Sequence, residues 1–202
     1  MVLLSVIVLA LSNIDIFSRF HVISSDRRAK LQNDISFALD HMTKIVAQAV
    51  GSFNDPAVKA YDDNKGIRVR IDNNPANGRP DTTDTWVAYR HENTGASSTD
   101  SEIRYYPNAG QTETPAGSYE IIARKVIPSS DDFYGLEFSS SAGFDGAGWL
   151  HDNALNVRIT SCWNPAPAGI TFPPDDSPPL GNSDNPCVTM SSILYMRSVS
   201  TN

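Results

Sequence analysis

The sequence predicts an α+β protein in which one long N-terminal α-helix packs against an antiparallel β-sheet. The first 50 residues contain neither Gly nor Pro, and all 12 Gly and 13 Pro come after them. Gly costs about 1 kcal/mol and Pro about 3 kcal/mol in a helix interior, so this run is typical of a single helix. Beyond it, short segments alternate apolar and polar residues with the period of two that half-buried strands show. Helix first and strands afterwards is an α+β order.

The start of the predicted helix is apolar on every side. Met1–Leu11 contains only Ser5 as a polar residue, and the first charge is Asp15. A bilayer span needs about 20 apolar residues, and 14 residues precede Asp15. We expect residues 1–25 to project as an apolar half-helix into a membrane or the core of an assembly. A secretory signal peptide is the alternative, although it would need a basic start and a small-residue cleavage site before a folded domain.

The side chains expected to carry this apolar contact are ten of the large apolar residues among the first 17 positions. They are Val2, Leu3, Leu4, Val6, Ile7, Val8, Leu9, Leu11, Ile14 and Phe17. Within this part of the predicted helix, Ser12–Asp15 is the weakest helical point, because Ser, Asn and Asp side chains compete for backbone hydrogen bonds. We expect a local loosening of the helix there.

The second half of the helix, residues 26–53, is predicted to be amphipathic. Its apolar residues recur at steps of three and four, which places them on one face that packs on the sheet or on neighbouring helices. The stripe comprises Leu31, Ile35, Leu39, Met42 and Val46. It continues to Ala49, which favours assembly over a simple membrane tether. Gly51 and Pro56 are expected to end the helix. The pair Arg27–Arg28 suits a membrane-edge or subunit contact, or equally a solvated face.

Residues 54–202 are predicted to form one antiparallel β head domain of six or seven strands. The expected strands are 67–71, 85–90, 102–106, 119–126, 133–138, 155–160 and 188–196. The head carries 11 basic and 19 acidic residues, against five and four in the first 50, within a chain of net charge −7. An acidic head without a basic patch interleaved with aromatic residues gives no support for nucleic-acid binding.

Cys162 and Cys187 are the only cysteines. We expect a disulfide between them if the chain is exported. The loop 163–186 that they bound contains seven of the 13 prolines, and closing such a loop contributes about 3 kcal/mol. Two separate buried thiols are the alternative. A zinc site is disfavoured because neither cysteine has a second Cys or a His at ligand spacing.

No catalytic constellation is evident in the sequence, and we expect no enzyme. The four histidines stand in no known motif, and the sequence contains no nucleophile elbow, phosphate loop or dinucleotide fingerprint. No cofactor is expected. Oxygen-rich turns are the one metal-site alternative, for Ca²⁺, although Asp and Asn are also ordinary turn residues. The Ca²⁺ candidates are Asp62, Asp63, Asn64, Asp175, Asp176 and Asp184.

This layout resembles the type IV pilins and the pseudopilins of type II secretion. An apolar helix continues as an amphipathic one, an antiparallel sheet follows, and a Cys-bounded loop lies near the C-terminus. Within the helix, the stretch from Arg28 to Met42 is similar to the amphipathic half of minor-pilin helices. The likeness in layout covers the whole chain, whereas likeness of residues is confined to the helix.

The family's processing motif is absent. Members carry a Gly cleavage site and a Glu at the fifth mature position, whereas Met1 begins within the apolar run and Ser5 is uncharged. No processing residue is therefore assigned. Two explanations stay open: the mature chain extends about ten residues before Met1, which would complete the bilayer span, or the motif was never there.

The resemblance implies a pilin-like fold and a structural subunit of a type IV pilus-like filament on the cell surface. The implied partners are copies of the chain in a helical filament and, before assembly, the inner-membrane assembly machinery that receives the anchored subunit. A minor pilin or secretion pseudopilin at a filament tip is the alternative within the family. From another class, the alternative is a membrane-anchored extracytoplasmic domain whose head binds a ligand.

Overall fold

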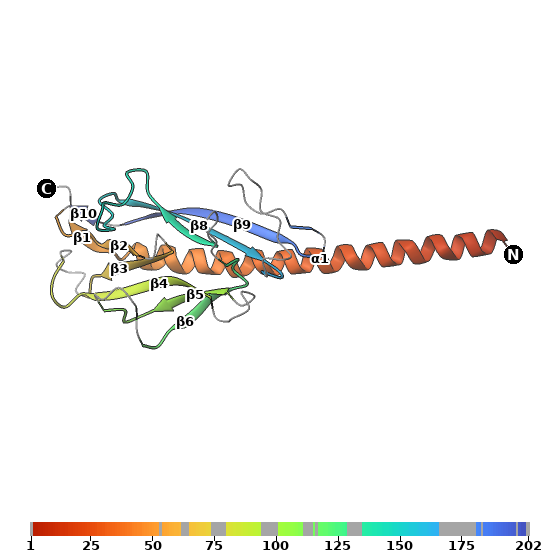
Figure 1. Cartoon of the computed structure of the whole chain (residues 1–202), viewed down its shortest axis with the longest axis horizontal. Helices are drawn as coiled ribbons and strands as arrows, with labels where there is room; N and C mark the ends of the chain where they lie inside the picture. Colours follow the sequence, from red (N-terminus) through yellow and green to blue (C-terminus); the bar gives the residue numbers. More distant parts are fainter. Residues whose placement is uncertain are drawn as a thin grey trace.

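The computed structural model shows an elongated molecule in which a head of β-strands packs on one half of a long helix (Figure 1). The structure describes residues 2–52, 54–61, 65–73, 80–93, 101–110, 115, 117–128, 135–165, 181–182, 184–196 and 198–200, without the side chains of 2, 3 and 198–200. The start of the helix and the strand at residues 198–200 lie toward opposite ends of the long axis (Figure 1). The expected α+β class is confirmed.

The helix α1 runs without interruption from Val2 to Val46. The expected loosening at Ser12–Asp15 is not seen: the Ser12 hydroxyl donates to the carbonyl of Val8 at 2.9 Å and keeps the helical path. The expected end at Gly51 was also wrong. The helix closes at Val46, and Gly51 lies in a strand. A Cβ on Gly51 would lie 2.4 Å from the amide nitrogen of Ala57, so glycine permits a close backbone approach there.

The strands form three sheets and not the single sheet that the sequence predicted. One sheet is antiparallel, with β2–β6 in chain order, a second is antiparallel with the order β7-β8-β9, and β1 pairs with β10 in parallel. The bounds are β1 (Val50–Ser52), β2 (Val58–Tyr61), β3 (Gly66–Ile71), β4 (Thr85–Asn93), β5 (Ser101–Tyr106), β6 (Glu120–Arg124), β7 (Leu136–Ser139), β8 (Ala154–Cys162), β9 (Cys187–Tyr195) and β10 (Ser198–Ser200).

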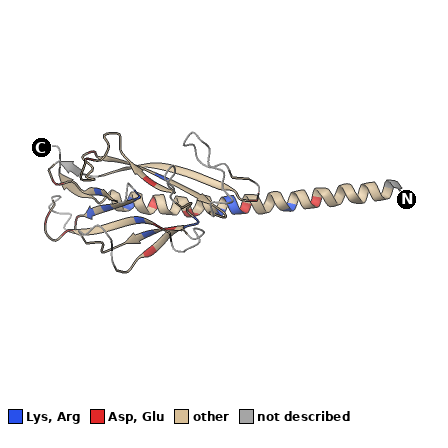
Figure 2. Ribbon diagram, viewed as in Figure 1, with Lys and Arg blue, Asp and Glu red and all other residues tan. Residues whose placement is uncertain are grey.

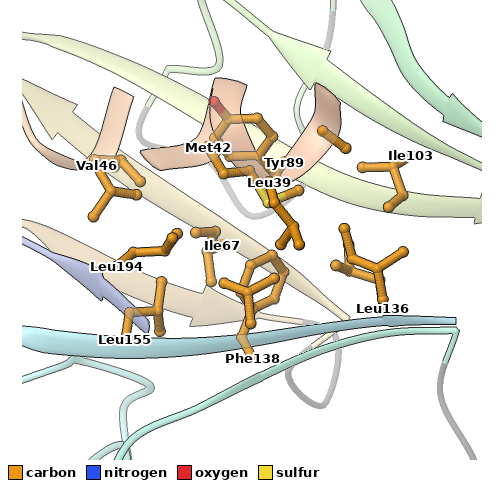
Figure 3. Packing of buried hydrophobic residues seen from close by; sticks show 14 of the residues in the cluster. Leu39, Met42, Val46, Ile67, Tyr89, Ile103, Leu136, Phe138, Leu155 and Leu194 are labelled. Carbon is orange, nitrogen blue, oxygen red and sulfur yellow. The ribbon is translucent and has the colours of Figure 1, made fainter. Parts of the chain in front are cut away.

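The two larger sheets enclose the second half of α1 as layers on either side of it (Figure 1). Their inner faces and the helix form one continuous apolar core. The structure places all five residues of the predicted helix stripe in that core: Leu31, Ile35, Met42 and Val46 are fully buried and Leu39 is nearly so. Figure 3 shows Leu39, Met42 and Val46 from the helix meeting residues of both sheets, among them Ile67, Tyr89 and Phe138.

This packing changes one interpretation of the sequence. The stripe that continues to Ala49 is covered by the head of its own chain, so its length does not by itself favour assembly over tethering. The amphipathic half of α1 is instead the central element of the head. Because two sheets face it, the helix aligns the whole head along the axis of its projecting half.

Candidate functional site

The projecting half of α1 exposes an unusual amount of apolar surface. Twelve large apolar side chains between Leu4 and Ile23 are 45–72% exposed, with Leu9 at 66% and Phe17 at 72%. An 18-residue window of this helix reaches a mean hydropathy of 1.6 and has no buried residue. By length and composition, the helix could cross a membrane, as a signal sequence near an N-terminus also could. Apolar surface of this extent marks a contact with lipid or protein.

Most of the residues predicted for assembly lie on this surface. Eight of the ten are exposed, and the side chains of the other two, Val2 and Leu3, lie outside the described residues. The predicted set ends at Phe17. The structure adds Ile16, Phe20, Val22 and Ile23, which are exposed on the same half-helix.

The charges within the projecting half neutralise each other. Arg19 Nε lies 3.0 Å from Asp15 Oδ2, one helical turn apart, and both side chains are exposed. Figure 2 shows this acidic and basic pair as the only charged positions along the outer part of the helix, with the next charges close to the head. A paired acid and base lower the cost of placing this segment in an apolar environment. The described apolar surface therefore extends beyond Asp15, to Ile23.

A groove of about 570 Å³ lies where the helix leaves the head. It is lined by Phe17, Phe20, His21, Ser24, Ser25, Arg28 and Asp184. Of the predicted pair of arginines, Arg28 faces this groove. The apolar half-helix thus meets polar groups of the head along one edge.

The other arginine, Arg27, fastens the Cys-bounded loop to the helix. Its Nη1 donates to the carbonyl oxygen of Asp184 at 2.8 Å, and its guanidinium lies 5.2 Å from the centre of the Trp163 ring. Lys30 and Lys125 also lie over this ring, at 5.9 and 4.2 Å, and Lys125 Nζ donates to the Trp163 carbonyl at 2.7 Å. Each cation–π contact contributes about 0.5–1 kcal/mol at an exposed site. Helix, loop and the residue after β6 meet at this indole.

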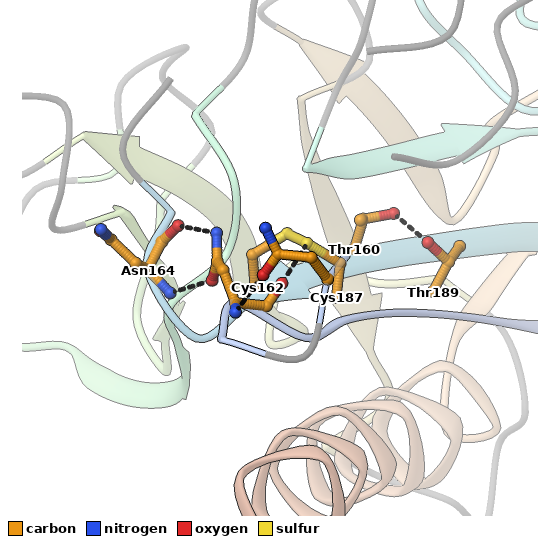
Figure 4. The surroundings of a disulfide bond; sticks show 7 residues. Thr160, Cys162, Asn164, Cys187 and Thr189 are labelled. Carbon is orange, nitrogen blue, oxygen red and sulfur yellow. Dashed lines mark hydrogen bonds between the residues drawn. A yellow bond between two sulfur atoms is a disulfide. The ribbon is translucent and has the colours of Figure 1, made fainter. Parts of the chain in front are cut away.

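A disulfide joins Cys162 and Cys187. The two residues are directly opposite in the pairing of β8 with β9, so the bond closes the loop at the point where the strands end. Beside it, the Thr160 and Thr189 hydroxyls are hydrogen-bonded at 2.8 Å (Figure 4). Asn185 accepts from the amide of Asn164 at 2.6 Å and donates to its carbonyl at 3.0 Å. Both ends of the loop are therefore fixed by covalent and hydrogen bonds.

The packed half of α1 keeps one face uncovered. The exposed positions recur at helical spacing opposite the buried stripe, and Ala29, Asn33, Ser36, Phe37, Asp40 and Lys44 are among them. Phe37 is 59% exposed, and Lys44 pairs with Asp40 at 2.6 Å as its spacing predicts. The exposed helical surface thus continues from the projecting half along the side of the head.

Two of the four histidines, which stand in no known motif, are packed in the head. His41 Nδ1 is hydrogen-bonded to the Tyr89 hydroxyl at 2.9 Å, and its ring meets Tyr105 edge-on at 4.7 Å. Burial lowers the pKa of His41 and raises that of Tyr89. The helix is therefore held to the five-stranded sheet by a polar contact within an apolar core.

His91 and Ser101 form the one close histidine–serine pair among the described residues, with His91 Nε2 at 2.5 Å from Ser101 Oγ. Ser101 donates its only hydroxyl proton to Asn93 Oδ1 at 2.9 Å. His91 must then donate its Nε2 proton to Ser101, and an imidazole protonated on that atom cannot act as its base. Burial lowers the pKa of His91 to about 4. This arrangement fixes β4 to β5 and does not activate the serine.

The Ca²⁺ candidates are largely outside the described part of the chain, where Asp62, Asp63, Asn64, Asp175 and Asp176 lie. Asp184 is described, and its carbonyl oxygen accepts the hydrogen bond from Arg27. Among the described residues, no three His, Cys, Asp or Glu side chains gather as a metal site would require.

No protein-family model, curated protein or solved structure matches the chain.

Proposed function

We propose that this protein is a structural subunit of a type IV pilus-like filament, anchored in the membrane by α1 before assembly and held in the filament by packing between helices. The observation that carries the proposal is the exposure of twelve large apolar side chains on the half of α1 that projects from the head. Neither the described head residues nor water gives these side chains an apolar environment.

The free energy gained by burying this apolar surface determines what kind of partner can cover it. Burial contributes about 25 cal/mol per Å² of apolar surface, so covering ten or more such side chains contributes on the order of 10–20 kcal/mol. A bilayer and a bundle of identical helices are both apolar enough to do this. Moving from one to the other leaves the apolar surface buried throughout, and a head-to-tail contact whose rotation does not close produces a filament.

The uncovered face of the packed half supports assembly beyond anchoring. A tether needs apolar residues only where it crosses the bilayer. In α1, exposed helix continues past that segment to Phe37, beside small residues such as Ala29 and Ser36. Small residues allow helices to approach closely. A neighbouring helix can therefore lie along α1 over most of its length.

Electron microscopy of filaments sheared from cells that express the full chain tests the proposal. We expect fibres that contain the protein, and we expect Ile7→Asp to abolish them because it places a charge in the apolar contact. Ile193→Asp is the matched control: this isoleucine of the head is exposed to 53%, against 48% for Ile7, and its replacement should leave fibres intact. Ile7→Asp cells that still make normal fibres, or wild-type cells that hold the protein only in the membrane, would contradict the proposal.

A further inference from the structure

A pocket on the outer face of the five-stranded sheet combines cations with two indole rings. It has a volume of about 240 Å³ and is lined by Asp55, Lys59, Arg68, Arg70, Trp86 and Trp149. Three paired strands, β2, β3 and β4, contribute to its lining, because Lys59 lies opposite Arg68 and Arg70 lies opposite Trp86. We refer to this site as the cation–indole pocket.

The segment before β8 brings the second indole to the pocket. Residues 148–150 pair with the edge of β2: Ala60 donates to the Gly148 carbonyl at 2.8 Å, and Leu150 donates to the Val58 carbonyl at 3.0 Å. Gly148 has a φ of 83°, and a Cβ there would lie 2.5 Å from the Ala60 carbonyl oxygen. Only glycine suits this approach. Trp149 is thereby placed beside Lys59 by backbone bonds.

The carboxylate of Asp145, four residues before Trp149, holds the same segment in place. Asp145 Oδ1 accepts from the amide of Trp149 at 2.7 Å and from that of Ala147 at 2.9 Å. These bonds and the neighbouring His151 hold the pKa of Asp145 below its usual value, with the His151 bond the largest cause. The Trp149 side of the pocket is therefore held in place before any ligand arrives.

The cations of the pocket differ in what they already bind. Arg70 already makes four hydrogen bonds, since it donates to Asp55 Oδ2 at 2.7 Å and to the carbonyl oxygens of Val50, Asp55 and Pro56. Lys59 lies with its ammonium 5.1 Å from the centre of the Trp149 ring, and no carboxylate of the described residues forms an ion pair with it. An ammonium has three donors, which leaves Lys59 able to bind an anion.

The two indoles form an inclined apolar corner of the pocket and leave no parallel slot between them. Their ring centres are 6.2 Å apart and their planes are inclined by 58°. Both side chains are half-buried. Pockets for drug-sized ligands measure about 300–1,000 Å³, so a smaller pocket suits a ligand of a single ring. Three cations against one carboxylate in the lining, within a chain of net charge −7, select a negative ligand.

We propose that the cation–indole pocket binds a small single-ring carboxylate, with its carboxylate on the Lys59 ammonium and its ring against Trp149 and Trp86. A uronic acid and an aromatic acid share this chemistry. The proposal does not depend on filament assembly, because every residue in it belongs to the head of one chain.

Titration of the full chain in detergent micelles, followed by the indole N–H signals in NMR, tests the proposal. Glucuronate and benzoate are the two acids, and glucose is the neutral ring. We expect saturable shifts of the Trp86 and Trp149 signals, with glucose binding at least tenfold more weakly than glucuronate. Trp163 contacts Arg27 outside the pocket and serves as an internal control whose signal stays fixed. Which of the two acids binds more tightly identifies the source of the carboxylate.

Two lysine variants test whether the Lys59 ammonium is the charge that binds the acids. Lys59→Gln should weaken binding of the acids about tenfold, whereas Lys44→Gln, on the exposed face of α1, should leave it unchanged. Melting temperature and disulfide content establish that each variant is folded. Trp149→Leu is a second test of the proposed contact, because it keeps the Lys59 ammonium and removes the indole ring. Equal binding of glucuronate and glucose, or wild-type affinity in Lys59→Gln, would overturn the proposal.

Discussion

Arg27 of the helix donates to the carbonyl oxygen of Asp184, 157 positions away in the chain, at 2.8 Å. The same guanidinium covers Trp163, which follows directly after Cys162. One side chain therefore joins the point where α1 leaves the head to both ends of the disulfide-closed loop. This contact suggests that the state of the loop and the environment of the projecting helix influence each other.

Replacement of Arg27 tests this coupling. Arg27→Ala removes the hydrogen bond and one cation over Trp163, at a cost of about 1–2 kcal/mol in local stability. Amide hydrogen exchange should become faster at Trp163 and Asn185. Arg28→Ala, the adjacent arginine that faces the groove, is the control and should change exchange little there. Equal protection in both variants would mean that Arg27 does not hold the loop.

Removal of the disulfide should destabilise the head without changing its fold. The double variant Cys162→Ser with Cys187→Ser frees a loop whose closure contributes about 3 kcal/mol in the chain-entropy description. Chemical denaturation of both proteins gives the difference. Alkylation without reductant followed by mass spectrometry checks the premise, and two alkylated thiols in the exported protein would disprove it.

A charge in the helix stripe should be far more costly than one at an exposed position just beyond the end of α1. Met42 is fully buried, so Met42→Asp leaves an unpaired carboxylate in the core and should cost several kcal/mol. Gln48→Asp changes an exposed residue and should cost less than about 0.5 kcal/mol. Thermal melts of the two variants decide the matter. Similar melting temperatures would show that the stripe does not carry the stability of the head.

Acid should weaken the head before its carboxylates titrate. His91 has an unfolded pKa of 6.5, and burial lowers its folded pKa to about 4; burial lowers the folded pKa of His41 too. Below pH 6.5 the unfolded chain therefore binds more protons, and the free energy of unfolding falls as pH drops. For His91 alone, the loss between pH 7 and pH 5 is on the order of 2 kcal/mol.

Denaturation curves at pH 7 and pH 5 measure this loss. His91→Gln keeps a donor for Ser101 and removes the titrating group, so its stability should depend less on pH than that of the wild type. Asn33→Gln changes an exposed residue of α1 that does not titrate and should keep the wild-type dependence. The same slope in all three proteins would assign the acid sensitivity to other groups.

Detergent and salt should act differently on assembled material. Lower ionic strength increases repulsion between acidic heads, but screening affects exposed charges far more than a dry helix bundle. Detergent offers the exposed apolar side chains an equivalent environment. We expect detergent to release subunits and low salt to leave fibres intact, as judged by sedimentation. Fibres that dissolve in low salt and resist detergent would place the main contact in the heads.

Sequence periodicity was a good guide wherever burial is one-sided. The spacing of Leu31, Ile35 and Met42 predicted the packed face of α1, and alternation in Ile67–Ile71 predicted β3 to within one residue. Both signals arise because one face of a regular element meets a core. The pairing of the cysteines was also predictable, since the sequence offers no other partner.

Features that depend on contacts distant in sequence were not predictable. β1 and β10 are three residues each, too short for any period, and their pairing is fixed only by the folded head. The arginines of β3 were expected to face water from a half-buried strand, but Arg68 and Arg70 are buried because Tyr61 and Trp86 cover them. Gly51 indicated a helix end because a close backbone approach leaves no local signal.

The pairing of β1 with β10 has a consequence for how the protein is made. Val50 follows the helix almost directly, yet its partner, Ser198, is among the last described residues. Leu194, in β9, fills the core against the helix stripe. A chain emerging from the ribosome therefore exposes its apolar helix long before these strands exist to cover it, and such exposed surface is prone to aggregate. The packed half of α1 therefore needs shelter until β9 and β10 are made, whereas insertion of the projecting half into a membrane would cover only the other part of the helix.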